Sequence, residues 1–175
     1  MKFLPTTKEE MKNLGWDSID VLLISGDTYL DTSYNGSALI GKWLVEHGFK
    51  VGIIAQPEVD VPDDITRLGE PNLFFAVSGG CVDSMVANYT ATKKRRQQDD
   101  FTPGGVNNKR PDRAVLVYSN MIRRFFKGTT KKIVISGIES SLRRITHYDY
   151  WTNKLRKPIL FDAKADILSY GMGEM

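Results

Sequence analysis

Five short apolar runs, each closed by small or polar residues, predict the strands of a buried sheet. They cover residues 20–27, 49–55, 72–77, 132–137 and 166–171. Runs that are apolar at almost every position are typical of parallel strands covered on both faces.

Between these runs, apolar residues recur at helical spacing. Residues 36–48 repeat apolar positions every three to four residues and stop at Gly48, and Pro62 opens a short helix. A further helix is expected to begin within 81–89, and residues 114–126 carry the widest apolar stripe. Alternating strands and helices predict one α/β domain over 1–175. Its expected architecture is an open three-layer, doubly wound, mostly parallel five-stranded sheet of flavodoxin-like or cobalamin-binding-like type.

Residues 91–111 are poor in apolar positions and predict an exposed insertion. The basic run from Lys93 to Arg96 could touch phosphates, with Tyr89 and Phe101 as stacking groups. We favour a solvated loop, because Asp99 and Asp100 follow at once.

Composition narrows the classes of function. The chain has 175 residues, a formal net charge of +3 and a single cysteine, Cys81. One cysteine allows neither an internal disulfide nor a cluster of several thiolates. The small charge excess does not indicate nucleic-acid binding. No apolar run approaches the roughly 18 residues of a membrane span, and the start of the chain does not resemble a secretory signal, so we expect a cytoplasmic protein without membrane contact.

The exits of three predicted strands are expected to meet at one edge of the sheet, where such folds bind ligands. These exits are short segments of serine and glycine that could form close contacts with a ligand or simply turn the chain. They match neither the phosphate loop nor the dinucleotide fingerprint. The candidate cofactor-binding residues are those of the exits together with Glu139, an acidic residue that follows the third exit. The exit residues are Ser25, Gly26, Asp27, Ser78, Gly79, Gly80, Ser136 and Gly137.

Two further side chains, Cys81 and His47, could have a chemical or a structural role on their own. Cys81 could be a nucleophile if a helix start lowers its pKa. We favour buried packing, because unpaired cysteines are most often interior. His47 precedes a glycine at a helix end, which indicates a capping role.

The segment 139–151 combines charges, aromatic rings and an imidazole. Asp149 could orient His147 for acid–base catalysis, or the segment could dock another domain. We favour docking, because aromatic residues and arginine are enriched in interfaces. The expected interface residues are Arg143, Arg144, His147, Tyr148, Asp149, Tyr150 and Trp151, and we assign no catalytic residue and no metal ligand.

Several longer motifs resemble a known family. They are the start of the chain over residues 3–11, the segment Gly52-Ile53-Ile54-Ala55-Gln56-Pro57, the segment 136–144 with His147 to Trp151, and Lys164-Ala165-Asp166 with 170–174. Together they resemble the N-terminal region of the YgiQ family of radical SAM proteins.

This resemblance implies a downstream barrel with a CxxxCxxC motif that holds a [4Fe-4S] cluster and binds S-adenosylmethionine, all outside this chain. The chain would be an accessory domain that docks on the barrel of the same polypeptide, helps to cover it and is inactive alone. We do not favour cobalamin as a ligand, because the DxHxxG motif is missing. The alternatives are a stand-alone small-molecule module, for cobalamin or a nucleotide-like ligand, and a protein-interaction domain.

Overall fold

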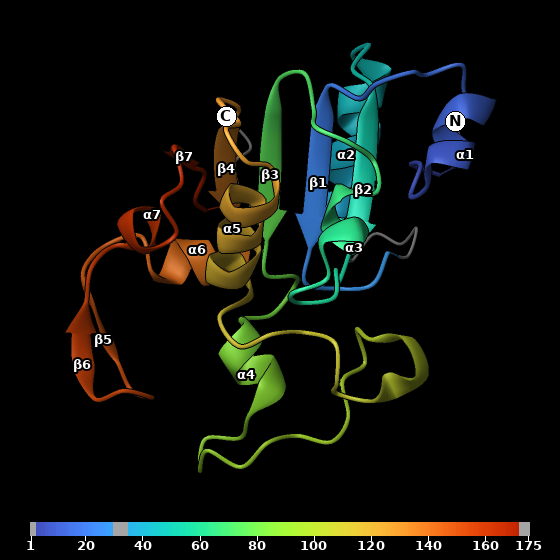
Figure 1. Cartoon of the computed structure of the whole chain (residues 1–175). Helices are drawn as coiled ribbons and strands as arrows, with labels where there is room; N and C mark the ends of the chain where they lie inside the picture. The colour runs from blue at the N-terminus through green and yellow to red at the C-terminus, as the bar shows by residue number, and fades with distance from the viewer. Residues whose placement is uncertain (1–2, 30–34, 172–175) are drawn as a thin grey trace.

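A five-stranded, all-parallel sheet forms the centre of the molecule (Figure 1). The computed structural model describes residues 3–29 and 35–171. The sheet has the order β2-β1-β3-β4-β7, which is a flavodoxin-like topology and confirms the predicted fold class. Its strands are β1 (Val21–Ser25), β2 (Val51–Ala55), β3 (Phe74–Ser78), β4 (Lys132–Ser136) and β7 (Ile167–Leu168).

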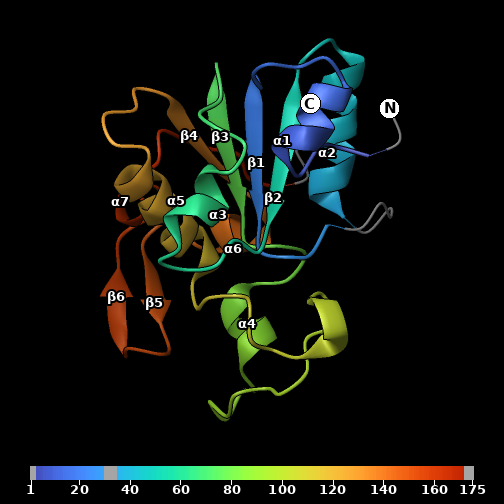
Figure 2. The same ribbon diagram turned by 45° about the vertical axis from the view of Figure 1, so that its right-hand side comes forward.

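Helices lie on both faces of this sheet (Figures 1 and 2). One face carries α2 (Gly36–Glu46), and the other carries α3 (Pro62–Thr66) and α5 (Ala114–Phe125). The α5 stripe packs against Phe75, Val77 and Ile133 in one core cluster. A smaller cluster on the α2 face contains Val21, Leu23 and Ile53. None of the helices in the described part of the chain is long and apolar enough to cross a membrane.

The two cores are covered to different extents. Every residue of β1 is buried, as expected for a central strand with cover on both faces. In β3, by contrast, Phe75 and Val77 on the α5 face are fully buried, whereas Phe74 and Ala76 on the α2 face are half-buried. The α2 face of the sheet is therefore covered mainly at its β1 and β2 side.

Several elements were not predicted from the sequence. They are α1 (Lys8–Asn13), α6 (Gly137–Leu142), α7 (Ile159–Asp162), the short 3₁₀ turn Pro103–Gly105 and a two-stranded antiparallel hairpin of β5 (His147–Asp149) and β6 (Lys154–Arg156). The helix expected within 81–89 is α4 (Ser84–Asn88). It begins at Ser84 because the Asp83 side chain accepts hydrogen bonds from the backbone N–H groups of Met85 and Val86.

The segment 91–111 is mostly exposed but contains four buried polar residues. These are Asp99, Thr102, Asn107 and Arg110. Arg110 Nη2 lies 2.6 Å from Asp27 Oδ1, directly after β1, and Gln56 Nε2 donates to Thr102 Oγ1 at 2.7 Å. The second half of the segment is thus tied to the carboxyl-terminal edge of the sheet.

Candidate functional site

The predicted strand exits meet at this carboxyl-terminal edge. Ser25 of β1 pairs in register with Ser78 of β3, and Ser78 pairs with Ser136 of β4. The backbone N–H of Gly26 donates to the carbonyl of Ser78 at 2.9 Å. Because side chains in register on parallel strands point to the same face, the three serines form a row on the α2 side.

The glycines that follow the serines allow the exits to pack against one another. A Cβ atom on Gly26 would lie 2.1 Å from the carbonyl oxygen of Gly79. At Gly80 a Cβ would lie 2.1 Å from Asp27 Oδ1, and the φ of +107° also favours glycine. Close backbone approach within the protein therefore explains these two glycines without a ligand.

A cavity of about 640 Å³ lies beside the serine row. Its lining includes six of the nine candidate residues, namely Ser25, Asp27, Ser78, Gly80, Ser136 and Gly137. Gly26, Gly79 and Glu139 lie outside the lining. The apolar lining comes from the sheet, from α2 and from α6, with Leu23, Ile40, Leu44, Phe74, Ala76, Val134 and Ile138. The site is thus a groove with an apolar sheet floor and hydroxyl groups at one end.

Asp27 is the charged residue among the described residues that line the groove, but its carboxylate already accepts hydrogen bonds from other groups of the protein. Oδ1 accepts from Arg110 at 2.6 Å, and Oδ2 accepts from the backbone N–H of Cys81 at 2.6 Å. The Arg110 side chain is fully buried and also lies 3.3 Å from Asp99 Oδ2. Asp27 therefore joins the segment 91–111 to the sheet edge.

Cys81 differs from both sequence-based hypotheses. It is exposed, so the prediction of buried packing is wrong. Partial burial of the sulfur raises the pKa of its thiol to about 11, and the neighbouring Asp27 adds to this rise. The helix dipole does not offset these effects, because α4 begins only at Ser84. The raised pKa contradicts the hypothesis of a lowered pKa and gives no support to a nucleophilic thiolate.

Glu139 joins three helices from a buried position. Its Oε2 accepts from the backbone N–H of Ser84 and its Oε1 from that of Val115, both at 3.1 Å. Burial raises the pKa of this carboxyl group, and the nearby Asp83 adds to the rise. These contacts connect α6 to the first turns of α4 and α5.

Asp149 holds the hairpin through a set of charged hydrogen bonds. It accepts from Arg113 Nη2 at 2.7 Å, from Arg156 Nε at 2.8 Å and from Thr152 Oγ1 at 2.6 Å. Burial acts to raise the pKa of Asp149, but the hydrogen bonds from Thr152 and Arg156 and the charge of Arg113 outweigh it, so the pKa is lowered. The hairpin is thereby fixed to the residue that precedes α5.

The other expected interface residues lie on or beside this hairpin. Tyr148 and Tyr150 are exposed, and the Trp151 ring packs 4.8 Å from the Tyr89 ring. Arg143 forms an ion pair with Asp83, and Arg144 donates to the carbonyl of Ser141. His147 Nδ1 lies 3.1 Å from the carbonyl oxygen of Ile145, while Asp149 is engaged by arginines. The alternative of a His147–Asp149 catalytic pair thus gains no support.

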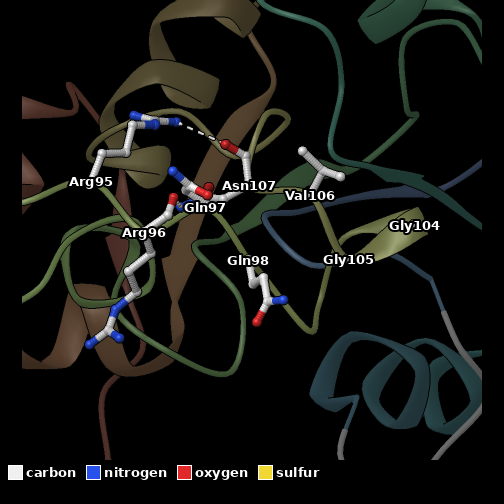
Figure 3. Close-up of a pocket in the computed structure, with 8 residues that line it drawn as sticks. All are labelled: Arg95, Arg96, Gln97, Gln98, Gly104, Gly105, Val106 and Asn107. Carbon is white, nitrogen blue, oxygen red and sulfur yellow. Dashed lines mark hydrogen bonds between the residues drawn. The ribbon is translucent and has the colours of Figure 1, made fainter.

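A second hollow lies on the segment 91–111 (Figure 3). It measures about 660 Å³ and is lined by residues 95–98 and 104–107. Its arginines donate to groups of the protein itself, Arg95 to the carbonyl of Asn107 at 3.5 Å and Arg96 to those of Val86 and Tyr89 at 3.2 Å. Lys93 donates to the carbonyl of Tyr150 at 3.1 Å. These contacts favour a loop held by its own chain over a phosphate-binding run.

The fold and the site together define the class of protein. It is a flavodoxin-like α/β domain with a groove at its strand ends. The chain belongs to the Radical SAM N-terminal family, whose model matches residues 3–175. This confirms the resemblance to the N-terminal region of the YgiQ family. No solved structure matches the chain.

Curated relatives are much longer than this chain. It is 99% identical to UPF0313 protein FN0734 of Fusobacterium nucleatum over 175 residues, which are 100% of this chain and 31% of that protein. It is 62% identical to a UPF0313 protein of Thermotoga neapolitana, covering 98% of this chain and 30% of that protein. For UPF0313 protein MJ1155 of Methanocaldococcus jannaschii the identity is 56%, over 98% of this chain and 28% of that protein. The chain therefore spans about a third of the length of these relatives.

Proposed function

We propose that this chain is the part of a radical SAM enzyme that docks on the catalytic barrel and helps to cover it. The family match identifies an N-terminal domain of a radical SAM protein, and the relatives are about three times as long. The barrel of the same polypeptide is the proposed partner.

A group of exposed apolar and aromatic side chains carries this proposal. We call it the hairpin face, and it consists of Leu142, Ile145, Tyr148, Tyr150, Leu155 and Phe161. Tyr148 is 57% exposed and Leu155 is 76% exposed. In Figure 1 the hairpin projects from the side of the sheet, away from the core. These residues belong to α6, to the hairpin and its flanking segment, and to α7. Tyr148 and Leu155 are cross-strand partners in the hairpin, so their side chains share one of its faces. Exposed apolar groups that lie together typically mark an interaction surface, and tyrosine is enriched at interfaces.

The hairpin face is presented on a pre-organised support. Asp149 fixes the hairpin to Arg113, and the Tyr150 hydroxyl donates to the carbonyl of Ala91 at 3.2 Å. A surface that is already ordered loses less conformational entropy when it binds. This favours a lasting interface between domains.

The iron–sulfur chemistry is assigned to the barrel. A [4Fe-4S] cluster is held by several cysteine thiolates, and this chain has one cysteine. The described residues contain no group of three or more histidine, cysteine or acidic side chains arranged to hold a metal. The residues present thus do not fit the cluster, and we expect the cluster and S-adenosylmethionine to bind in the remaining two thirds of the protein.

The docking proposal can be tested in the full-length protein with the double substitution Tyr148→Ala and Leu155→Ala, which removes two exposed side chains that are cross-strand partners in the hairpin. We expect faster limited proteolysis between this domain and the barrel, because the variant loses apolar contact area with the barrel. The matched control is Leu73→Ala, which removes a side chain that is 47% exposed just before β3. Proteolysis as slow as in the wild type and the control would reject docking through the hairpin face.

The groove at the strand ends supports a second candidate function, small-molecule binding. Its volume of about 640 Å³ falls within the usual range of ligand sites, and its serine row could orient polar groups. Cobalamin and a nucleotide-like molecule are the ligands to test. Titration with cobalamin, followed by visible absorbance, should change the spectrum if this second function is right, and a constant spectrum would exclude cobalamin.

A further inference from the structure

Charged residues are distributed unevenly over the chain. Segments 91–98 and 142–161 contain nine of the 24 lysine and arginine residues but one of the 21 aspartate and glutamate residues, the buried Asp149. Their formal charge is therefore +8, whereas the remaining residues, 15 basic and 20 acidic, carry −5. In Figures 1 and 2 the hairpin and the segment that follows α4 both project beyond the carboxyl-terminal edge of the sheet. The small net charge of the chain is thus the sum of a strongly positive end and a negative remainder.

Segment 91–98 lies directly against the hairpin. Lys93 Nζ donates to the carbonyl of Tyr150 at 3.1 Å and lies 4.3 Å from the centre of the Tyr150 ring. The Tyr150 hydroxyl donates to the carbonyl of Ala91, which is 59 residues away in the chain. The two positive segments therefore form one continuous surface.

Two arginines of the hairpin region are paired within the domain. Arg143 forms an ion pair with Asp83, and Arg156 forms one with Asp149. Both carboxylates are buried. The charges of these two arginines are therefore compensated inside the domain.

Four other basic side chains surround the hairpin face without a carboxylate partner. We call them the basic rim, and they are Lys93, Arg144, Lys154 and Lys157. Arg144 directly precedes Ile145, and Lys154 and Lys157 lie within two residues of Leu155. All four side chains are exposed, and none forms an ion pair with a residue that the structure describes.

The combination of hairpin face and basic rim favours a protein as the partner. An apolar centre with a polar border is the usual anatomy of a protein–protein interface. Leu155 and Phe161, which are 76% and 67% exposed, supply apolar groups for such a centre. Nucleic acids bind instead through phosphate contacts and through stacking on aromatic rings, to which exposed aliphatic side chains contribute little.

We propose that the barrel surface that meets the hairpin face is acidic, with carboxylates opposite the basic rim. This inference rests on the proposed function for the identity of the partner and adds the chemistry of the partner's surface. Complementary charges at the border of an interface set the orientation of the two surfaces and exclude wrong contacts. Because the remainder of the domain carries −5, it repels the same acidic surface. Charge therefore selects the hairpin end for docking.

Carbodiimide crosslinking of the full-length protein tests this inference, because the reagent joins a lysine amine to a carboxylate that it contacts. Lys154 and Lys157 are the probe positions. Lys12 and Lys127 are the matched controls, since they are also exposed and lie outside both positive segments. Mass spectrometry identifies the joined residues. We expect Lys154 or Lys157 to be joined to aspartate or glutamate residues of the barrel, with a yield several times that of the control lysines.

Charge reversal provides a second readout. The double substitution Lys154→Glu and Lys157→Glu should accelerate limited proteolysis between this domain and the barrel severalfold at low salt. For the wild type, the same acceleration should appear when salt is raised to about 0.5 M, because the screening length then falls to about 4 Å. The variant should lose this dependence on salt. Lys12→Glu with Lys127→Glu is the control of equal charge change, and cleavage of an unfolded peptide at each salt concentration corrects for effects on the protease.

The outcomes separate this inference from docking itself. If a photoreactive analogue at Tyr148 reaches the barrel but the probe lysines are joined to no barrel carboxylate, docking stands and the acidic partner surface is wrong. If neither reaches the barrel, docking through the hairpin face fails as well. Equal crosslinking of probe and control lysines, or proteolysis that responds to neither salt nor charge reversal, would also contradict the inference.

Two other partners would give different results. Lysine–carboxylate crosslinks formed only between two copies would assign the basic rim to a dimer and overturn the inference. Fluorescence anisotropy with a labelled single-stranded RNA of about 20 nucleotides tests the nucleic-acid alternative. We expect equal, weak binding by the wild type and by the Lys154→Glu and Lys157→Glu variant. Submicromolar binding that the variant loses would assign the basic rim to nucleic acid and contradict an acidic barrel surface.

Discussion

Arg110 is the most deeply buried cation in the described structure, and its removal should strongly destabilise the fold. Its side chain is 0% exposed and lies between Asp27, at 2.6 Å, and Asp99, at 3.3 Å. The substitution Arg110→Met keeps a long apolar side chain but removes the positive charge. Two buried carboxylates would then face each other without a counter-ion.

The size of the effect follows from this geometry. Breaking a buried ion pair by removing one partner costs about 3–5 kcal/mol, because the remaining charge stays in a poorly solvated place. For a domain of this size each kcal/mol lowers the melting temperature by about 2–4 °C, so we expect a decrease of about 10 °C. Adding Asp99→Asn should recover part of the loss, because one of the two uncompensated charges is then removed.

Urea unfolding of the 175-residue chain, followed by circular dichroism, measures this loss. Lys109→Met is the matched control, since Lys109 is exposed beside Arg110 and should change stability by less than about 0.5 kcal/mol. A loss below about 1 kcal/mol for Arg110→Met would mean that this ion cluster does not hold the segment 91–111 to the sheet.

Three further predictions concern the hairpin, the strand exits and the thiol. Asp149→Asn should lower the free energy of unfolding by about 2 kcal/mol at neutral pH. Because the folded-state pKa of Asp149 is lowered, the difference between wild type and variant should shrink as the pH falls from about 5 to about 2. Urea unfolding measures this difference, and a difference independent of pH would contradict the prediction. Gly26→Ala should lower the free energy of unfolding by about 1–3 kcal/mol in the same assay, because the new Cβ would clash with the Gly79 carbonyl. Gly36→Ala should lower it much less, because the space around Gly36 is open. Alkylation of Cys81 should accelerate about tenfold per pH unit up to pH 10, because its thiol pKa is about 11, and a rate that levels off near pH 8 would refute this value.

The parallel sheet and α5 could be predicted from the sequence, because each carries its signal locally. Short apolar runs mark β1 and β4, and helical spacing marks α5. The hairpin carries no such signal. Lys154 and Arg156 occupy β6, and the strands are held by contacts of Asp149 with Arg113, which is 36 residues away in the chain.

The candidate site could be predicted only in part, because some of its contacts join residues that lie far apart in the sequence. Parallel strands bring Ser25, Ser78 and Ser136 to one edge, so the convergence of the exits follows from topology. The burial of Arg110 depends on Asp27, which is 83 residues away, and a single arginine in a polar segment does not reveal that partner. The groove itself depends on which half of the sheet face lacks a helix, which local patterns do not encode.

In the proposed function, this domain docks on the radical SAM barrel through the hairpin face. A photoreactive phenylalanine analogue at Tyr148 of the full-length protein tests it most directly, since this side chain is 57% exposed on the hairpin. We predict crosslinks to peptides of the barrel, in the part of the protein that follows this domain. Crosslinks confined to residues 1–175, or formed only between two copies of the protein, would mean that the hairpin face does not dock on the barrel.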